Sequence, residues 1–212
     1  MASNTYVTPM KKRTFLAGLA ALGFAPAARA QAKQLSLGEI SKYLNALRSA
    51  KGEFTQINPD GSLSKGAFYI KRPGRMRFEY EGRDSALVVA GQGTLAIFDK
   101  KSNAGPQQYP LGRTPLNIIL RKTVNLGQSS MVTGHDFDGT ATSITAQDPK
   151  HPNTGNVKLV FTDSPIELRQ WVVTDQSGSK TTVILGKLDP KARVPLRLFD
   201  LDALIKNNGE TR

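Results

Sequence analysis

The residues from 71 to 80, KRPGRMRFEY, combine a tight turn with a regular alternation of charged and apolar side chains. Pro73 fixes its own φ and Gly74 tolerates a positive φ, and this pair predicts a type II turn. Because successive side chains of a strand point to opposite faces, the two arginines and the glutamate after the turn share one face, and the methionine, phenylalanine and tyrosine share the other. The segment therefore predicts a strand with one apolar face, and it places Arg72 at the rim of that face.

Segments with the composition of strands recur at short intervals along the chain, and turn-forming residues end them. The predicted strands comprise residues 53–57, 66–72, 75–80, 85–90, 94–99, 130–138, 140–147, 156–162, 166–175 and 180–188. The turns within each series are too short for a crossover helix, which indicates an antiparallel meander. Because the sequence shows no internal repeat and no interdomain linker, we predict a mainly β (α+β) domain with one strongly curved sheet.

Two segments predict short helices beside this sheet. Residues 36–39 form a capping box, and apolar residues recur at helical spacing in residues 37–47. The Lys-Gly pair at 51–52 is typical of a helix end. The Thr-Pro pair at 114–115 predicts an N-cap with proline at the first helical position. Residues 116–120 make this second helix more apolar than a short surface helix requires.

The N-terminal residues have the pattern of a secretory signal peptide. Residues 11–13 are cationic, residues 15–25 are apolar, and the Ala-Arg-Ala sequence at 28–30 predicts cleavage after Ala30. A membrane anchor and a first core helix are the alternatives, but the apolar stretch is too short to span a bilayer. We therefore assign residues 1–30 to an export signal.

The mature chain is predicted to be one domain, residues 31–212. Met10 is a second plausible start, which leaves open whether residues 1–9 are an upstream mis-start. Residues 12–13 are Lys-Arg, whereas a twin-arginine signal has two arginines, so the export route stays open.

The composition limits what this exported chain can bind. The chain has 29 Lys and Arg and 17 Asp and Glu, and residues 1–30 hold four of the cations and no acid, so the mature net charge is +8. In an exported protein this charge favours anionic lipid head groups or an acidic partner surface over nucleic acid, with a solvated surface as an equal alternative. The chain has no cysteine, so it lacks disulfides and a lipid-attachment site and must be stabilised by burying apolar surface.

The sequence offers little that could perform catalysis. It has no cysteine nucleophile, only two histidines, and no G-x-S-x-G, H-E-x-x-H or P-loop motif. Residues 135–139, HDFDG, bring three potential metal ligands together, but Asp-x-Asp-Gly is also turn chemistry, and the distal glutamate of a calcium loop is missing. We expect a turn there, and no enzyme activity, metal or cofactor.

The aromatic residues are spread along the predicted strands and do not cluster with cations, as a nucleic-acid platform would require. They include Phe54, Phe68, Phe78, Phe98, Phe161 and Trp171. Since most fall on one alternating face, they are expected to fill a core or line a cavity, and no nucleic-acid partner is expected.

Several of these segments together resemble the outer-membrane lipoprotein carrier (LolA) family. They are Phe-Thr-Gln at 54–56 after an amphipathic helix, Lys-Arg-Pro-Gly at 71–74 before an aromatic strand, the hairpin at 87–99, and Thr-Pro-Leu at 114–116. The resemblance covers most of residues 35–175. It depends on the order and spacing of the segments, since each one alone is weakly specific.

The resemblance implies an incomplete antiparallel barrel that short α-helices cover, with a hydrophobic cavity between them. It implies a soluble, monomeric periplasmic protein that accepts acylated lipoproteins from an inner-membrane ABC-type release complex. An outer-membrane acceptor, where one exists, would receive them. The family's arginine in the Arg-Pro turn bonds to the helical lid, and the matching residue is Arg72. Met76 and Ala96 depart from aromatic residues that are common in the family, which leaves the range of cargo open.

The resemblance and the alternation of the strands together predict the residues of the acyl-chain cavity. These are Phe54, Phe68, Met76, Phe78, Leu87, Val89, Leu95, Ile97, Ile118 and Ile119. A shift of one residue in any strand would exchange the faces of its side chains. A periplasmic regulator that senses lipid or lipoprotein with the same half-barrel is the main alternative to a carrier.

Overall fold

The computed structural model describes residues 32–82, 86–99, 105–127 and 130–210, so the predicted signal peptide lies outside the described residues. The strands are β1 (Ser49–Ile57), β2 (Leu63–Lys71), β3 (Met76–Tyr80), β4 (Leu87–Gly91), β5 (Thr94–Phe98), β6 (Gln107–Pro110), β7 (Val132–Phe137), β8 (Thr142–Gln147), β9 (Asn156–Asp163), β10 (Ile166–Thr174) and β11 (Lys180–Leu185). The helices are α1 (Leu37–Ala46), α2 (Asn117–Leu120) and α3 (Leu201–Glu210), with 3₁₀ turns η1 (Leu111–Arg113), η2 (Pro152–Thr154) and η3 (Leu196–Phe199). Among the described residues, every helix is too short or too polar to cross a bilayer.

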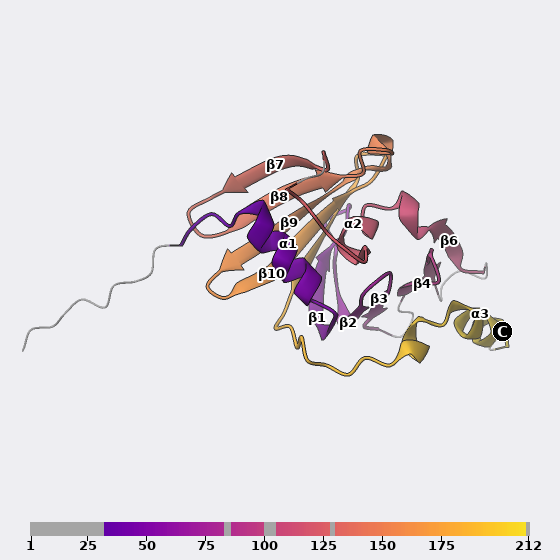
Figure 1. The fold of residues 1–212 in the computed structure, drawn as a ribbon. Coiled ribbons are helices and arrows are strands. Elements are labelled where there is room, and N and C mark those ends of the chain that lie inside the picture. Colours follow the sequence, from indigo (N-terminus) through magenta and orange to yellow (C-terminus); the bar gives the residue numbers. More distant parts are fainter. Residues whose placement is uncertain (1–31, 83–85, 100–104, 128–129, 211–212) are drawn as a thin grey trace, which may run out of the picture. The chain divides into compact units, whose positions relative to one another are not determined.

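In the described part of the chain, eleven strands form one open, curved antiparallel sheet with the order β6-β5-β4-β3-β2-β1-β11-β10-β9-β8-β7 (Figure 1). The two edge strands, β6 and β7, are consecutive in the chain. The connection between them contains η1 and α2, so it leads from one edge of the sheet to the other. The predicted mainly β class is confirmed, although β6 is not among the predicted strands.

Glycines at the β1–β2 pair allow aromatic rings to lie over the strands. Gly52 pairs with Phe68, and Phe54 pairs with Gly66. A Cβ atom at Gly66 would lie 2.0 Å from the backbone oxygen of Glu79, and one at Gly52 would lie 2.9 Å from Cε1 of Phe68. These glycines therefore permit close approaches that any side chain would prevent.

Helix α1 begins as the sequence predicts but ends earlier. The Ser36 hydroxyl accepts a hydrogen bond from the Glu39 amide, and the Glu39 carboxylate accepts one from the Ser36 amide. The bond from the Ser36 amide and the bond from Lys33 lower the pKa of Glu39 to about 2. The helix ends at Ala46, because the backbone from Ser49 onwards pairs with β2. The prediction that residues 51–52 end this helix is therefore wrong.

Apolar side chains pack on both faces of the sheet. On the inner face, α1 covers β9 and β10, where Tyr43 contacts Phe161 with ring centroids 5.8 Å apart. We call the buried residues of this face the inner cluster; it comprises Leu35, Ile40, Leu44, Phe54, Phe68, Ile70, Met76, Phe78, Ala90, Leu111, Ile118, Ile119, Leu120, Val124, Leu126, Met131, Ile144, Ala146, Val157, Leu159, Phe161, Leu168, Trp171, Val183 and Leu185.

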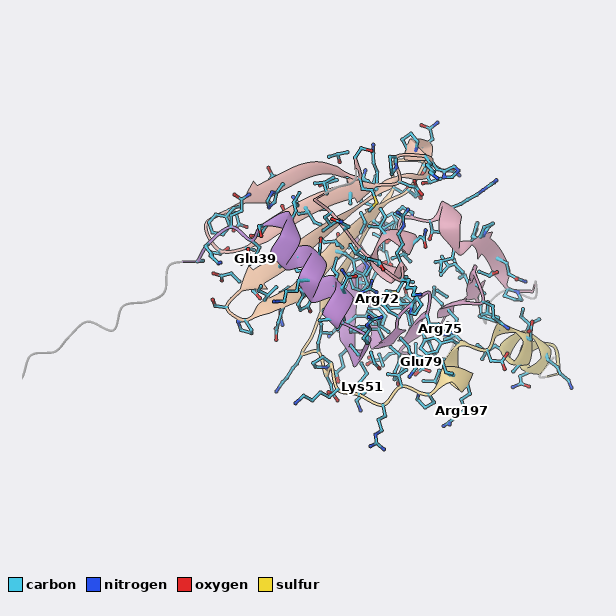
Figure 2. All side chains as sticks on the ribbon, viewed as in Figure 1. Glu39, Lys51, Arg72, Arg75, Glu79 and Arg197 are labelled. Atoms are coloured by element: carbon cyan, nitrogen blue, oxygen red, sulfur yellow. The ribbon has the colours of Figure 1, made fainter. Side chains whose placement is uncertain are left out.

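The C-terminal segment, for which the sequence predicts no role, covers the outer face of β3–β5. The outer cluster consists of Val89, Ala96, Phe98, Val194, Phe199 and Leu201. Lys71 Nζ donates to the Val194 carbonyl at 2.9 Å, and Arg77 Nη1 donates to the Leu198 carbonyl at 2.9 Å. The charged face of the predicted 75–80 strand is thus partly covered by the chain itself (Figure 2).

Candidate functional site

The inner face brings together most of the side chains that the sequence assigns to a cavity. Phe54, Phe68, Met76, Phe78, Ile118 and Ile119 belong to the inner cluster, and Leu95 packs against it. Ile97 lies on the same face, since it pairs with Val88, which also packs against the cluster. Strands and α2 therefore contribute to one continuous apolar interior.

The assignment of Leu87 and Val89 to this interior is wrong. Val89 belongs to the outer cluster, and Leu87 packs against that cluster, while Val88 and Ala90 face inward. Residues 87–89 are all apolar, so alternation cannot show which of them point inward. A slip of one residue reverses every side chain of a strand, which explains why both assignments fail together.

Aromatic rings form the centre of the interior. Trp171 is 1% exposed, and its ring lies 6.4 Å from Phe68 and 6.0 Å from Phe78, with edge-to-face geometry. Phe54 contacts Phe78 at 5.0 Å. Trp171 is among the aromatic residues expected in a core or cavity, but it is not among the predicted site residues; the structure places it in the inner cluster.

Two open hollows adjoin the inner face near β4 and β5. One has a volume of about 650 Å³, and its lining includes Tyr80, Val88 and Ile97. The other has a volume of about 640 Å³, and its lining includes Leu95, Ile97 and Pro115. Because inward-facing residues of the sheet form part of both walls, the interior can be approached from this side.

Helix α2 is attached to the turn between β2 and β3 by two hydrogen bonds. Arg72 Nη2 donates to the Arg121 carbonyl at 2.5 Å, and the Gly74 amide donates to the Leu120 carbonyl at 2.8 Å. The last carbonyls of a helix have no partner within it, so this turn supplies donors for two of them. The predicted N-cap is wrong, because the Thr114 hydroxyl donates to the Leu111 carbonyl and α2 has no side-chain cap.

The turn between β2 and β3 contains the Pro-Gly pair that the sequence places there. The peptide bond from Arg72 to Pro73 is cis, while Gly74 has the predicted positive φ, at 72°. The Arg72 amide donates to the Arg48 carbonyl at 2.8 Å, which fixes the turn against the end of the α1 segment. Figure 2 shows Arg72 beside the end of α1.

The Arg72 side chain is buried and only partly satisfied. The residue is 7% exposed, and its Nε and Nη1 atoms have no acceptor among the described residues. Burial, and then the positive charge of Arg48, lower the pKa of the Arg72 guanidinium from its ordinary value. Unpaired buried donors cost free energy, so the net stabilisation from the contact between Arg72 and the Arg121 carbonyl is modest.

The chain after α2 is also attached to α1. Asn45 pairs with Val124 through two hydrogen bonds, of 2.8 and 2.9 Å. The Leu126 amide donates to Ser41 Oγ at 3.0 Å. As a result, α1 and the segment that contains α2 together cover the inner face.

The polar cluster at residues 135–139 forms a strand end and a turn. His135 lies in β7, with Nε2 2.8 Å from the Leu35 carbonyl. The Asp138 carboxylate accepts bonds from Thr140 and Ala141, so the turn interpretation is confirmed. Within the ranges that the structure describes, no group of three or more His, Asp or Glu side chains could hold a metal ion.

Comparisons with known proteins identify the family. Residues 45–202 match the family model described as outer membrane lipoprotein carrier protein LolA. An outer-membrane lipoprotein carrier protein of Cupriavidus pinatubonensis is 23% identical over 201 residues, which are 90% of this chain and 94% of that protein. One of Legionella pneumophila (strain Lens) is 27% identical over 183 residues, 80% of this chain and 86% of that protein. The crystal structure of a LolA superfamily protein from Nitrosomonas europaea superposes with a TM-score of 0.42 at 11% identity, covering 80% of this chain and 99% of that one. The family model spans well over half of the chain, and the chain therefore belongs to the outer-membrane lipoprotein carrier (LolA) family.

Proposed function

We propose that this protein is a periplasmic carrier that binds the acyl chains of lipoproteins in the interior between its sheet and α2. The observation that carries the proposal is a short apolar helix that a buried arginine and the Gly74 amide hold over an apolar inner face, in a member of the LolA family. The role needs no catalytic group. It needs an apolar interior and a cover that can open, and the inner cluster and α2 fit these two requirements.

Acyl chains are a physically suitable cargo for this interior. Each buried methylene contributes about 0.8 kcal/mol, so three chains would bind too tightly to leave unaided. Release then requires competition from another apolar site, such as an outer-membrane acceptor. We infer that loading starts from an inner-membrane ABC-type release complex, as the family resemblance implies, and that the carrier acts as a monomer.

In this proposal Arg72 is the latch of the lid. When cargo enters, α2 moves away and the bond between Arg72 and the Arg121 carbonyl breaks. A single hydrogen bond from a charged donor contributes about 1.5–3 kcal/mol, which the burial of a few methylenes can replace. The two unpaired donors of Arg72 lower the stability of the closed form further, so the lid is held weakly enough for cargo to open it.

Analysis of bound lipid tests the carrier role. The mature protein should be purified from the periplasm of its own bacterium, and co-purifying molecules should be identified by mass spectrometry. We expect acylated lipoproteins, and we expect the added protein to release lipoproteins from spheroplasts. A protein free of lipid and lipoprotein that also releases none from spheroplasts would exclude the carrier role.

A further inference from the structure

Arg121, the residue that follows α2, is held at both its backbone and its side chain. Its carbonyl accepts the hydrogen bond from Arg72 Nη2. Its own Nη2 lies 3.1 Å from Asp148 Oδ2, and its Nη1 lies 3.2 Å from the sulfur of Met131. One residue at the end of the helix is thus fixed to two separate parts of the sheet.

These two attachments lie far apart in the sheet. Arg72 follows β2, and Asp148 follows β8. The strands β1, β11, β10 and β9 separate β2 from β8 in the sheet order. Arg121 therefore joins two regions of the sheet that share no strand pairing.

We propose that the Arg121–Asp148 ion pair is a second closing contact for α2, so that the lid is held from both halves of the sheet and not by Arg72 alone. The inference rests on the proposed function, in which α2 moves to admit cargo. We call this contact the cross-brace. Arg121 and Asp148 are positioning residues, because neither belongs to the apolar inner cluster that would hold the acyl chains.

The environment of the pair supports an effective contact. The side chains of Arg121 and Asp148 are 32% and 17% exposed, so solvent screens their attraction less than it screens a surface pair. Burial would raise the pKa of Asp148, but the Lys150 amide bond and the charges of Arg121 and His151 outweigh it and hold the pKa below its ordinary value. Asp148 is therefore ionised at neutral pH.

The cross-brace changes how the lid is expected to open. Without the Asp148 contact, α2 would still be attached to the β2–β3 turn through Arg72, but among the described residues the chain directly after it would be held on the β8 side only through its bonds to α1. Loss of the Asp148 charge should therefore increase the open population without changing a single apolar contact to the cargo. The equilibrium between closed and open forms should shift about fivefold, which corresponds to one partly buried ion pair.

Asp148→Asn is the variant that removes the charge with the least disturbance. The asparagine oxygen can still accept the Lys150 amide bond that Asp148 Oδ1 accepts at 2.9 Å, so the loop keeps its local geometry. Asp136→Asn is the matched control, since Asp136 is an exposed carboxylate on β7. Because the chain has no cysteine, Lys122→Cys and Lys158→Cys introduce unique spin-label sites on the lid segment and on β9.

Distances between these labels, measured by pulsed electron paramagnetic resonance without lipid, test the cross-brace directly. We expect one narrow distribution for the parent protein and for Asp136→Asn, and an added longer component for Asp148→Asn. Uptake of a fluorescent diacyl lipopeptide should be about fivefold faster for Asp148→Asn than for the parent. Unchanged distances in Asp148→Asn, or equal changes in both variants, would overturn the cross-brace.

Two further results distinguish a failure of the carrier role from a failure of the cross-brace. If Asp148→Asn lengthens the distance but no variant binds the lipopeptide, the cross-brace stands and the carrier role fails. Asp148→Glu keeps the carboxylate and should restore the narrow distribution. If it folds as the parent does but keeps the long component, Asp148 acts only through its loop, and the cross-brace is excluded. Thermal unfolding of each variant shows whether it is folded.

Discussion

Carrier protein with Arg72→Leu should accumulate in a loaded form that cannot deliver its cargo. Leucine removes the donor to the Arg121 carbonyl and adds an apolar side chain beside the inner cluster. The empty closed form loses its main polar contact while the loaded form gains apolar contact, so both changes favour retention of cargo. We expect transfer to outer-membrane vesicles to fall at least about tenfold, since a bond from a charged donor contributes about 1.5–3 kcal/mol. The measurement is the fraction of radiolabelled lipoprotein transferred with time.

Arg75→Leu is the matched control for this experiment. Arg75 is an arginine of the same turn, and within the described part of the chain its Nη1 donates to the neighbouring Pro73 carbonyl, at 3.2 Å, and not to α2. Its replacement removes the same charge but leaves the contact with α2 in place. Transfer should therefore remain close to that of the parent protein. Normal transfer by Arg72→Leu, or an equal loss in both variants, would show that Arg72 only supports the scaffold.

The second large effect is expected on stability, from Gly66→Ala. The added methyl group would lie 2.0 Å from the Glu79 backbone oxygen, and neither atom can move away without separating β2 from β3. We expect a loss of at least about 3 kcal/mol in the free energy of unfolding, at the upper end of overpacking effects. Urea denaturation followed by Trp171 fluorescence measures this loss.

Gly112→Ala provides the comparison, since a Cβ atom there meets no other atom within 4 Å. Its free energy of unfolding should differ from that of the parent by no more than about 0.5 kcal/mol. A Gly66→Ala protein of parental stability would mean that β2 and β3 approach less closely at Gly66 than the 2.0 Å contact requires. The strand β3 would then not depend on glycine for its position over the interior.

The parts of the fold that sequence could predict are those with a regular local signal. The alternation of residues 75–80 identifies the inner side chains of β3 correctly, and the capping box identifies the start of α1. Residues 87–89 are all apolar and show no alternation. Leu87 and Val89 face the side of the sheet that the C-terminal segment covers, which the sequence does not indicate. Strand β6 is short and exposed, so it has little composition typical of a strand.

The candidate site was less accessible to sequence reasoning, because its contacts join distant residues. The family resemblance identifies Arg72, but its partner is a backbone carbonyl, and any residue at position 121 could supply one. The Arg121–Asp148 pair connects a helix end to a strand end, and neither segment has a pattern that predicts the other. Such contacts follow from the sheet order, which becomes known only when the chain is folded.

The fluorescence of Trp171 shows whether acyl chains occupy the interior. This residue is the only tryptophan of the chain and lies within the inner cluster at 1% exposure. A synthetic triacyl lipopeptide with brominated chains should quench it in a saturable way, at one lipopeptide per protein, and the same lipopeptide without bromine should not. Binding of the brominated lipopeptide that leaves Trp171 unquenched would exclude the interior as the acyl-chain site, because the chains would then lie outside it.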